Sequence, residues 1–354
     1  MGYGNYSYAS RDVRTKALKG TKVLNIKTDD LAAANKLLND HGFTNVNTGS
    51  HLTANVSSAA EATTINDFLA SNGISASISH VDDSYISYAN KSIGETFTHR
   101  QINNAMSPYG IGVRESRDSK EHPNSLGIIV ALDETGSMGS VPHYLVRDGL
   151  PMLIDRIIKG GIPDPQVLFM GIGDHECDEA PLQVGQFESS DELMDKWLTD
   201  LYLEGRGGGN AGESYLLAWY FAAFHTAMDC FEKRRKKGYC ITIGDEPTLK
   251  NIPERALKKL IGPGQYQSFS AFDLLNKAQE TFHVYHLNIS ETASGRRASV
   301  KDGWKQLLAD NFIDVQSKTQ VAEIIASIIL RNENTAQQYV PTESIKTDDS
   351  EMML

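Results

Sequence analysis

The chain has 354 residues, of which 40% are hydrophobic and 22% are charged, so it can bury a substantial core and is not a disordered polymer. At roughly 100 to 200 residues per domain, this length predicts two domains. The formal net charge of −11 at pH 7 disfavours nucleic acid as the main partner, because such binding depends largely on Lys and Arg.

The cysteines and the lengths of the apolar runs indicate the cellular compartment of the protein. Cys177, Cys230 and Cys240 show no CxxC spacing and leave an odd thiol, which disfavours both a disulfide framework and a zinc cluster. No apolar run approaches the roughly 18 to 20 residues of a membrane span, and the polar N-terminus lacks the core of a signal peptide. We therefore expect a cytoplasmic protein without a membrane partner.

A small α+β domain is predicted over residues 21–82, after a polar N-terminal arm at 1–20. Apolar alternation and helix caps predict the following elements in chain order: strand 21–26, helix 29–42, strands 43–48 and 51–58, helix 59–72 and strand 73–81. The order βαββαβ is that of a ferredoxin-like domain. RNA-binding domains of this fold stack bases on aromatic residues of the central strands. VLNIK and LTANV carry none, so we expect a scaffold or a protein-docking role.

A connector is predicted over residues 83–124. It contains most of the polar stretch RESRDSKEHPNS, whose proline and charges disfavour a regular element. After the connector, the chain enters LGIIVALD, a continuous apolar run that is typical of a parallel strand covered on both faces.

Residues 125–331 alternate between strands and helices. Strands are predicted at 126–133, 166–174, 182–187, 239–245, 282–289 and 312–315, and helices at 141–159, 190–203, 213–237, 254–260, 270–281, 303–309 and 321–330. This alternation predicts an α/β domain with a doubly wound, mostly parallel, Rossmann-like sheet. Residues 332–354 are predicted to form an acidic, flexible tail.

Oxygen-bearing side chains follow three of these segments, where a doubly wound sheet binds its ligands. The first loop, DETGSM, places three such residues at a spacing of two, and the Gly-rich second loop and the third loop add others. The candidate metal ligands are Asp133, Thr135, Ser137, Asn210, Glu213 and Asp245. Because these are oxygen ligands without His or Cys, they favour Mg²⁺, Mn²⁺ or Ca²⁺ over zinc.

VALDETGSM resembles the DxSxS loop of the metal-ion-dependent adhesion site of von Willebrand A domains, in its DxTGSM form. This resemblance covers residues 125–331 and extends to intracellular members of bacterial or phage type. It implies that the hydroxyls of Thr135 and Ser137 bind the metal directly, while Asp133 and Asp245 act directly or through water. It also implies an open coordination position that a carboxylate of a partner protein fills.

The second loop departs from the family pattern. Many members have a metal-binding Thr where this chain has Gly209, and GGGNAGES instead resembles the GGGDxPE variant. Glu213 or Asn210 is the expected replacement for the missing hydroxyl. An extra carboxylate would favour Ca²⁺ or Mn²⁺, so the choice among the three metals stays open.

Two further charged segments have simpler interpretations. GDHECDEAP suggests a zinc or cysteine site, but it lacks the HExxH spacing, so we expect a polar loop at a strand end. EKRRKK is predicted to be the solvated end of the long helix at 213–237, where cations suit the helix dipole.

The resulting hypothesis is a metal-dependent protein-binding module that is not an enzyme. In the intracellular branch, the resemblance implies work as an adaptor beside an AAA+ ATPase of the MoxR type. One alternative is a Mg²⁺-dependent hydrolase or phosphotransferase that uses Asp133 and Asp245, although the three loops offer no general base and no phosphate loop. A second alternative is an RNA-binding protein of the Ro type, which the acidic charge disfavours.

Overall fold

The computed structural model describes most of the chain between residues 22 and 338. The described residues are 22–28, 30–41, 45–47, 52–56, 65, 67–81, 91–136, 138, 140–205 and 212–338. They contain two separate hydrophobic cores. The smaller core includes Ile26 and Leu69, and the larger runs from Phe97 to Ile329.

The N-terminal core lies against a four-stranded antiparallel sheet. Its strands are β1 (Lys22–Thr28), β2 (Asn45–Asn47), β3 (Leu52–Val56) and β4 (Ala76–Val81), in the order β2-β3-β1-β4. Helix α2 (Leu31–Asp40) begins at Asp30, whose side chain accepts a hydrogen bond from the amide of Ala33 at 2.9 Å. This strand order is compatible with the predicted βαββαβ arrangement. The domain bounds stay a prediction.

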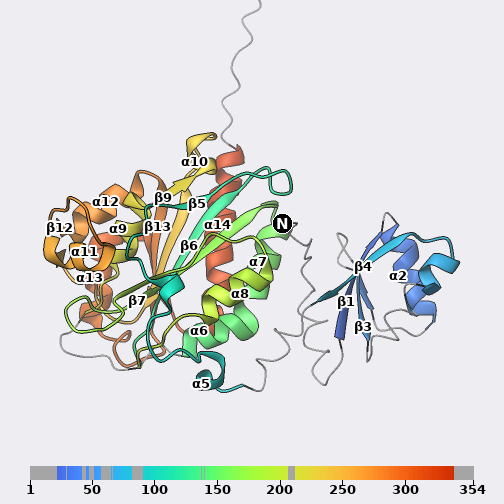
Figure 1. The fold of residues 1–354 in the computed structure, drawn as a ribbon, viewed down its shortest axis with the longest axis horizontal. Coiled ribbons are helices and arrows are strands. Elements are labelled where there is room, and N and C mark those ends of the chain that lie inside the picture. Colours follow the sequence, from blue (N-terminus) through green and yellow to red (C-terminus); the bar gives the residue numbers. More distant parts are fainter. Residues whose placement is uncertain are drawn as a thin grey trace, which may run out of the picture.

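The large core surrounds a six-stranded sheet (Figure 1). Its strands are β6 (Leu126–Asp133), β7 (Pro165–Ile172), β8 (Leu182–Val184), β10 (Gly238–Gly244), β13 (Phe282–Ile289) and β14 (Phe312–Val315). They lie in the order β14-β13-β10-β6-β7-β8, and every pair is parallel except β7 with β8. Counted in chain order, this is the 3-2-1-4-5-6 arrangement of a doubly wound sheet. The predicted fold class of this domain is confirmed.

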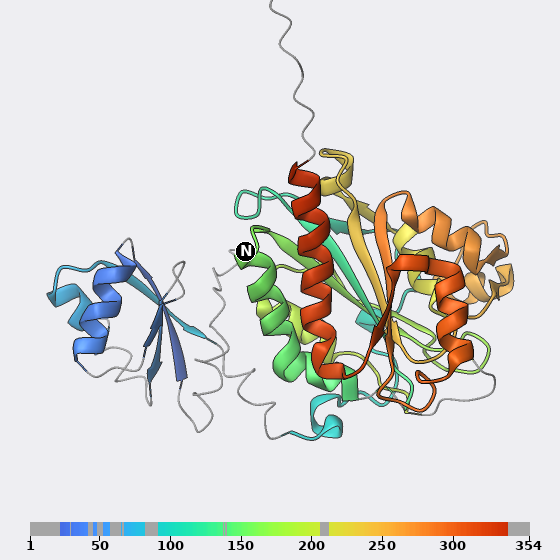
Figure 2. The same cartoon turned by 180° about the vertical axis from the view of Figure 1, so that it is seen from behind.

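Helices cover both faces of the large sheet (Figures 1 and 2). On one face, α7 (Leu150–Lys159) packs against α14 (Val321–Gln338). On the other face lie α9 (Leu216–Phe224), α12 (Ala271–Gln279) and α13 (Ala298–Leu308). This double cover explains why β6, β7 and β10 are buried along their whole length.

Further helical elements of the large domain are α6 (Ser140–Tyr144), a π-helical turn (Leu145–Gly149) that joins α6 to α7, α8 (Asp191–Thr199) and α11 (Glu254–Ile261). The helix predicted at 141–159 therefore contains one π-helical turn. None of the described helices is long and apolar enough to cross a membrane.

The long helix predicted over 213–237 is wrong. Helix α9 ends at Phe224, and the chain continues as strand β9 (Thr226–Met228) and the short helix α10 (Asp229–Glu232). The Thr226 hydroxyl donates to the carbonyl of Ala222 at 2.6 Å, and β9 pairs in parallel with β5 (Arg114–Ser116). Pairing with a distant strand therefore overrides the local helical pattern.

The expectation that the connector lacks regular elements is also wrong. It contains β5, the short helix α5 (Ile93–Thr96) and a 3-10 turn at Asn104–Met106. Phe97 and Met106 are buried in the core of the large sheet. The described part of the connector is therefore attached to the large domain.

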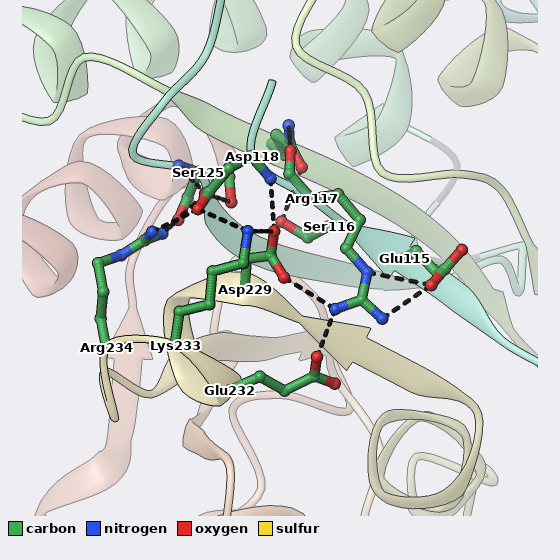
Figure 3. Close-up of polar contacts among 10 residues, drawn as sticks. Glu115, Ser116, Arg117, Asp118, Ser125, Asp229, Glu232, Lys233 and Arg234 are labelled. Atoms are coloured by element: carbon green, nitrogen blue, oxygen red, sulfur yellow. Dashed lines mark hydrogen bonds and ion pairs between the residues drawn. The ribbon is translucent and has the colours of Figure 1, made fainter. Parts of the chain in front are cut away.

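A group of ion pairs fastens β5 to α10 (Figure 3). Asp229 accepts hydrogen bonds from the Arg117 guanidinium and the Asp118 amide, both at 2.9 Å, and pairs with Lys233 at 2.6 Å. Asp118 in turn pairs with Arg234 at 2.7 Å. We call these five residues the β5–α10 clamp. Lys233 and Arg234 belong to EKRRKK, whose residues 232–235 are exposed at the end of the short helix α10. The run is therefore a solvated helix end as predicted, although the helix is not the long one at 213–237.

Asp229→Asn is expected to lower the free energy of unfolding by about 1 to 2 kcal/mol at pH 7, because a buried charged acceptor is lost. Burial raises the pKa of Asp229, but its bonds with Lys233, Asp118 and Arg117 hold the pKa below the ordinary 3.8. The ionised carboxylate therefore stabilises the fold above pH 3.8, and this stabilisation is lost as the pH falls through the lowered folded-state pKa.

Urea unfolding at pH 7 and at pH 3 measures this effect. The difference between wild type and Asp229→Asn should shrink at the lower pH. Asp302→Asn, at an exposed position on α13, is the matched control and should leave the free energy of unfolding unchanged. A difference of the same size at both pH values would contradict the role assigned to the carboxylate.

Candidate metal site

Two carboxylates lie at the point where the strand order of the large sheet reverses. Asp133 is the last residue of β6, and Asp245 directly follows the neighbouring strand β10. Both side chains are fully buried, and the charge of Asp245 raises the pKa of Asp133. In a doubly wound sheet, this edge between the two central strands is the usual ligand crevice.

Three hydrogen bonds hold the carboxylate of Asp133. Its Oδ1 accepts from the Thr135 amide at 2.9 Å and from the Thr135 hydroxyl at 2.6 Å, and its Oδ2 accepts from the Tyr215 hydroxyl at 2.6 Å. A carboxylate offers about four lone-pair positions, so Asp133 has little capacity left for a direct metal bond. The Thr135 hydroxyl donates its hydrogen bond to Asp133, and its oxygen can still offer a lone pair to a cation.

Asp133 lies in an environment that opposes its charge. Burial raises its pKa, the bonds from Thr135 and Tyr215 lower it, and Asp245 raises it, with a net value of about 6. A nearby cation would favour the charged form of Asp133.

The second loop ends against the third. The Glu213 amide donates to the carbonyl of Pro247 at 2.9 Å, and the Leu249 amide donates to the carbonyl of Glu213 at 2.8 Å. The Glu213 side chain is only 6% exposed, and its buried Oε2 has no hydrogen-bond partner among the described residues. Burial and the charge of Asp133 raise its pKa to about 10. A buried carboxyl in this setting requires either a proton or a cation.

The next residue joins the second loop to the loop after β7. Ser214 Oγ accepts from the His175 amide at 2.9 Å and lies 2.7 Å from the His175 ring nitrogen Nδ1, and the Ser214 amide donates to the carbonyl of Gly173 at 3.1 Å. Because Ser214 is fully buried, this pair joins two loops and presents no accessible nucleophile.

The donor set fits a hard cation that keeps most of its water. Among the described residues, no three His, Cys, Asp or Glu side chains are arranged to hold a metal by themselves. Mg²⁺ needs only one or two carboxylates and retains several waters. The Thr135 hydroxyl and the unpartnered Oε2 of Glu213 are donors of that kind.

The structure brings Asp133, Thr135, Glu213 and Asp245 to the same edge of the sheet. Ser137 and Asn210 lie outside the described residues. That these six residues bind a metal remains a prediction.

Two residues at this edge were not predicted from the sequence. Tyr215 appeared to belong to an apolar helix, and His175 appeared to belong to a polar loop. The available signal for Tyr215 was its position, two residues after Glu213 at the end of the Gly-rich loop. No sequence signal places His175 beside Ser214.

Comparisons with known proteins give distant likenesses only. No protein-family model matches the chain, and no curated protein matches it in sequence. Solved structures of similar fold include the pilus adhesin SpaC from Lactobacillus rhamnosus GG, with 12% identity over 62% of this chain and 31% of that one, and a TM-score of 0.42. The vWF domain of the type V pili tip protein Mfa5 from Porphyromonas gingivalis has 10% identity over 64% of this chain and 97% of that one, and a TM-score of 0.36.

A third similar structure is a von Willebrand factor type A protein from Catenulispora acidiphila. It has 10% identity over 64% of this chain and 50% of that one, with a TM-score of 0.34. The chain thus spans about a third of the length of SpaC and half of the Catenulispora protein. Likenesses at this distance carry no conclusion about what the chain binds.

Proposed function

We propose that the chain is a metal-dependent protein-binding module of the von Willebrand A type. The observation that carries the proposal is the burial of Asp133, Glu213 and Asp245 at the reversal of strand order, where Glu213 Oε2 has no partner in the described part of the chain. The resemblance of DETGSM to the adhesion-site loop supports the same function, since the loop directly follows β6.

The proposed ligands of Mg²⁺, or of Mn²⁺ or Ca²⁺, are the hydroxyls of Thr135 and Ser137 together with Glu213 or Asn210. Asp133 and Asp245 would hold the ion through water, as the three hydrogen bonds already made by Asp133 suggest. When bound, the ion supplies a Lewis-acidic position that a carboxylate of a partner protein can occupy.

A binding role is better supported than hydrolysis. A Mg²⁺-dependent hydrolase that uses Asp133 and Asp245 would need a general base, and the three loops contain no His or Lys for that role. We propose a cytoplasmic adaptor whose partner presents an acidic residue. That this partner is an AAA+ ATPase of the MoxR type is a finer proposal that rests on the sequence resemblance alone.

Thermal unfolding in chelator, Mg²⁺, Mn²⁺ or Ca²⁺ tests the metal site. At an ion concentration of about 100 times Kd, binding adds about 2.7 kcal/mol, which should raise the wild-type Tm by about 5 °C or more. Thr135→Ala removes a proposed ligand and should lose most of this rise. Thr281→Ala, at the opposite ends of the strands, should keep it.

A second measurement tests the open position. Mn²⁺ bound to wild type should strongly enhance the relaxation of water protons, since an open site keeps exchangeable water. Acetate, as a simple carboxylate, should reduce the enhancement. A wild-type Tm that no divalent ion changes, or bound Mn²⁺ without exchangeable water, would overturn the proposed function.

A further inference from the structure

Three consecutive residues at the end of the second loop contact three different strand ends. Glu213 pairs with the loop after β10 through Pro247 and Leu249. Ser214 binds the loop after β7 through His175. Tyr215 donates its hydroxyl proton to Asp133 at the end of β6. The second loop is therefore the element that joins the other loops of the site.

The Tyr215 ring is confined to one position. It is fully buried and meets Trp304 edge-on at 5.4 Å between ring centroids and His286 at 5.1 Å. Gly244 of β10 lies against the Tyr215 hydroxyl as well. A Cβ at Gly244 would be only 1.7 Å from the hydroxyl oxygen. The hydroxyl consequently has no room to swing away from Asp133.

A fixed hydroxyl on one oxygen of a carboxylate fixes the other oxygen too. With Oδ2 of Asp133 bound to Tyr215, Oδ1 stays turned toward the amide and hydroxyl of Thr135. The Thr135 hydroxyl then keeps donating its hydrogen bond to Asp133, which leaves its oxygen lone pairs free. Outer partners of this kind commonly change metal affinity by about 10- to 100-fold when removed.

We propose that Tyr215 is the positioning residue through which the second loop serves the metal site. It touches no metal and acts through Asp133. This inference rests on the proposed function, because it requires that a divalent ion binds beside Thr135. A purely structural Tyr215 would affect folding stability and leave metal affinity unchanged.

Tyr215→Phe keeps the packed ring and removes only the hydroxyl. We expect its Kd for Mn²⁺, measured by calorimetric titration, to be about 10-fold weaker than that of wild type. The matched control is Tyr239→Phe. Tyr239 is also fully buried and also donates to a carboxylate, that of Glu333 at 2.9 Å, but it lies near the start of β10, away from the site. This control should lose stability without losing Mn²⁺ affinity.

The outcomes separate the inference from the function on which it rests. A Kd of Tyr215→Phe equal to that of wild type overturns the inference and leaves the metal site intact. Wild type that binds no Mn²⁺ overturns both. If Tyr215→Phe does not fold, Trp304→Phe gives the same test, because it keeps the hydroxyl and loosens the ring against which Tyr215 packs. Unchanged affinity in that variant would then overturn the inference.

Discussion

Gly244→Ala is expected to lower the free energy of unfolding by about 3 kcal/mol and to remove detectable metal binding. The new Cβ would lie 1.7 Å from the hydroxyl oxygen of Tyr215 and 2.5 Å from its ring carbon Cζ. Because Trp304 and His286 pack against the buried ring, the ring cannot move without disturbing the core. Overpacking of this kind typically costs about 1 to 3 kcal/mol, and here it also displaces the hydroxyl from Asp133.

Gly303→Ala is the control for this substitution. Gly303 is exposed within α13, and a Cβ there would meet nothing within 4 Å. Alanine should therefore raise the free energy of unfolding by about 0.5 to 1 kcal/mol, as expected for a helix interior. Urea unfolding in chelator compares both variants with wild type. A Gly244→Ala protein as stable as wild type would show that the Tyr215 ring is less tightly held than we describe.

Glu213→Gln should raise the stability of the metal-free protein and reduce the stabilisation that metal binding adds. In metal-free protein, burial raises the pKa of Glu213 from 4.5 to about 10, so folding at pH 7 takes up a proton. This uptake opposes folding by up to about 1.4 kcal/mol for each pH unit above the unfolded pKa. Glutamine avoids it, and we expect metal-free Glu213→Gln to be roughly 2 to 3 kcal/mol more stable than wild type.

With Mg²⁺ present, the same substitution removes a negative charge that the cation would balance, so the stabilisation by metal should shrink. The stability of the metal-free protein should also depend on pH in a defined direction. Metal-free wild type should lose stability as the pH rises from 4.5 towards 10, because a raised carboxyl pKa stabilises the fold only at low pH, and Glu213→Gln should lack this part of the loss. Glu280→Gln, in an exposed ion pair with Lys277, is the control and should differ little from wild type. Equal effects of Glu213→Gln in chelator and in Mg²⁺ would contradict the prediction.

Strands buried on both faces were the easiest elements to predict. LGIIVALD is apolar up to its final aspartate and FHVYHLNI is largely apolar, and the structure forms β6 and β13 over those same residues. Their parallel arrangement follows from the helices between them. The ends of β6 and β10 then located Asp133 and Asp245 at one edge of the sheet, which is why this part of the site could be predicted.

Partners that are distant in sequence were not predictable from local pattern. Residues 213–237 are apolar at helical spacing, but Thr226–Met228 forms a strand because β5 lies beside it, more than a hundred residues earlier in the chain. His225 ends α9 near the carbonyls of Ile111 and Gly112, each 3.1 Å from its Nδ1. Sequence periodicity reports the exposure of a residue's own element, and it carries no information about which distant segment will pair with it.

The site residues that were missed have the same explanation. Tyr215 lies in a run of apolar residues, and only the fold shows that its hydroxyl reaches Asp133, 82 positions away. The pairing of Glu213 with Pro247 and Leu249 likewise depends on how two loops meet. The chemistry of single loops was therefore predictable from the sequence, whereas the contacts between loops were not.

The β5–α10 clamp has a consequence for the lifetime of the folded protein. Its Arg117–Asp229 bond joins residues 112 positions apart, so forming it early in folding would carry the entropy cost of closing a long loop. We expect such a contact to be absent from the folding transition state. Interactions of that kind hardly speed folding, but they slow the rate at which the native protein opens. The clamp therefore acts on the kinetics of unfolding, at the end of the sheet opposite the candidate metal site.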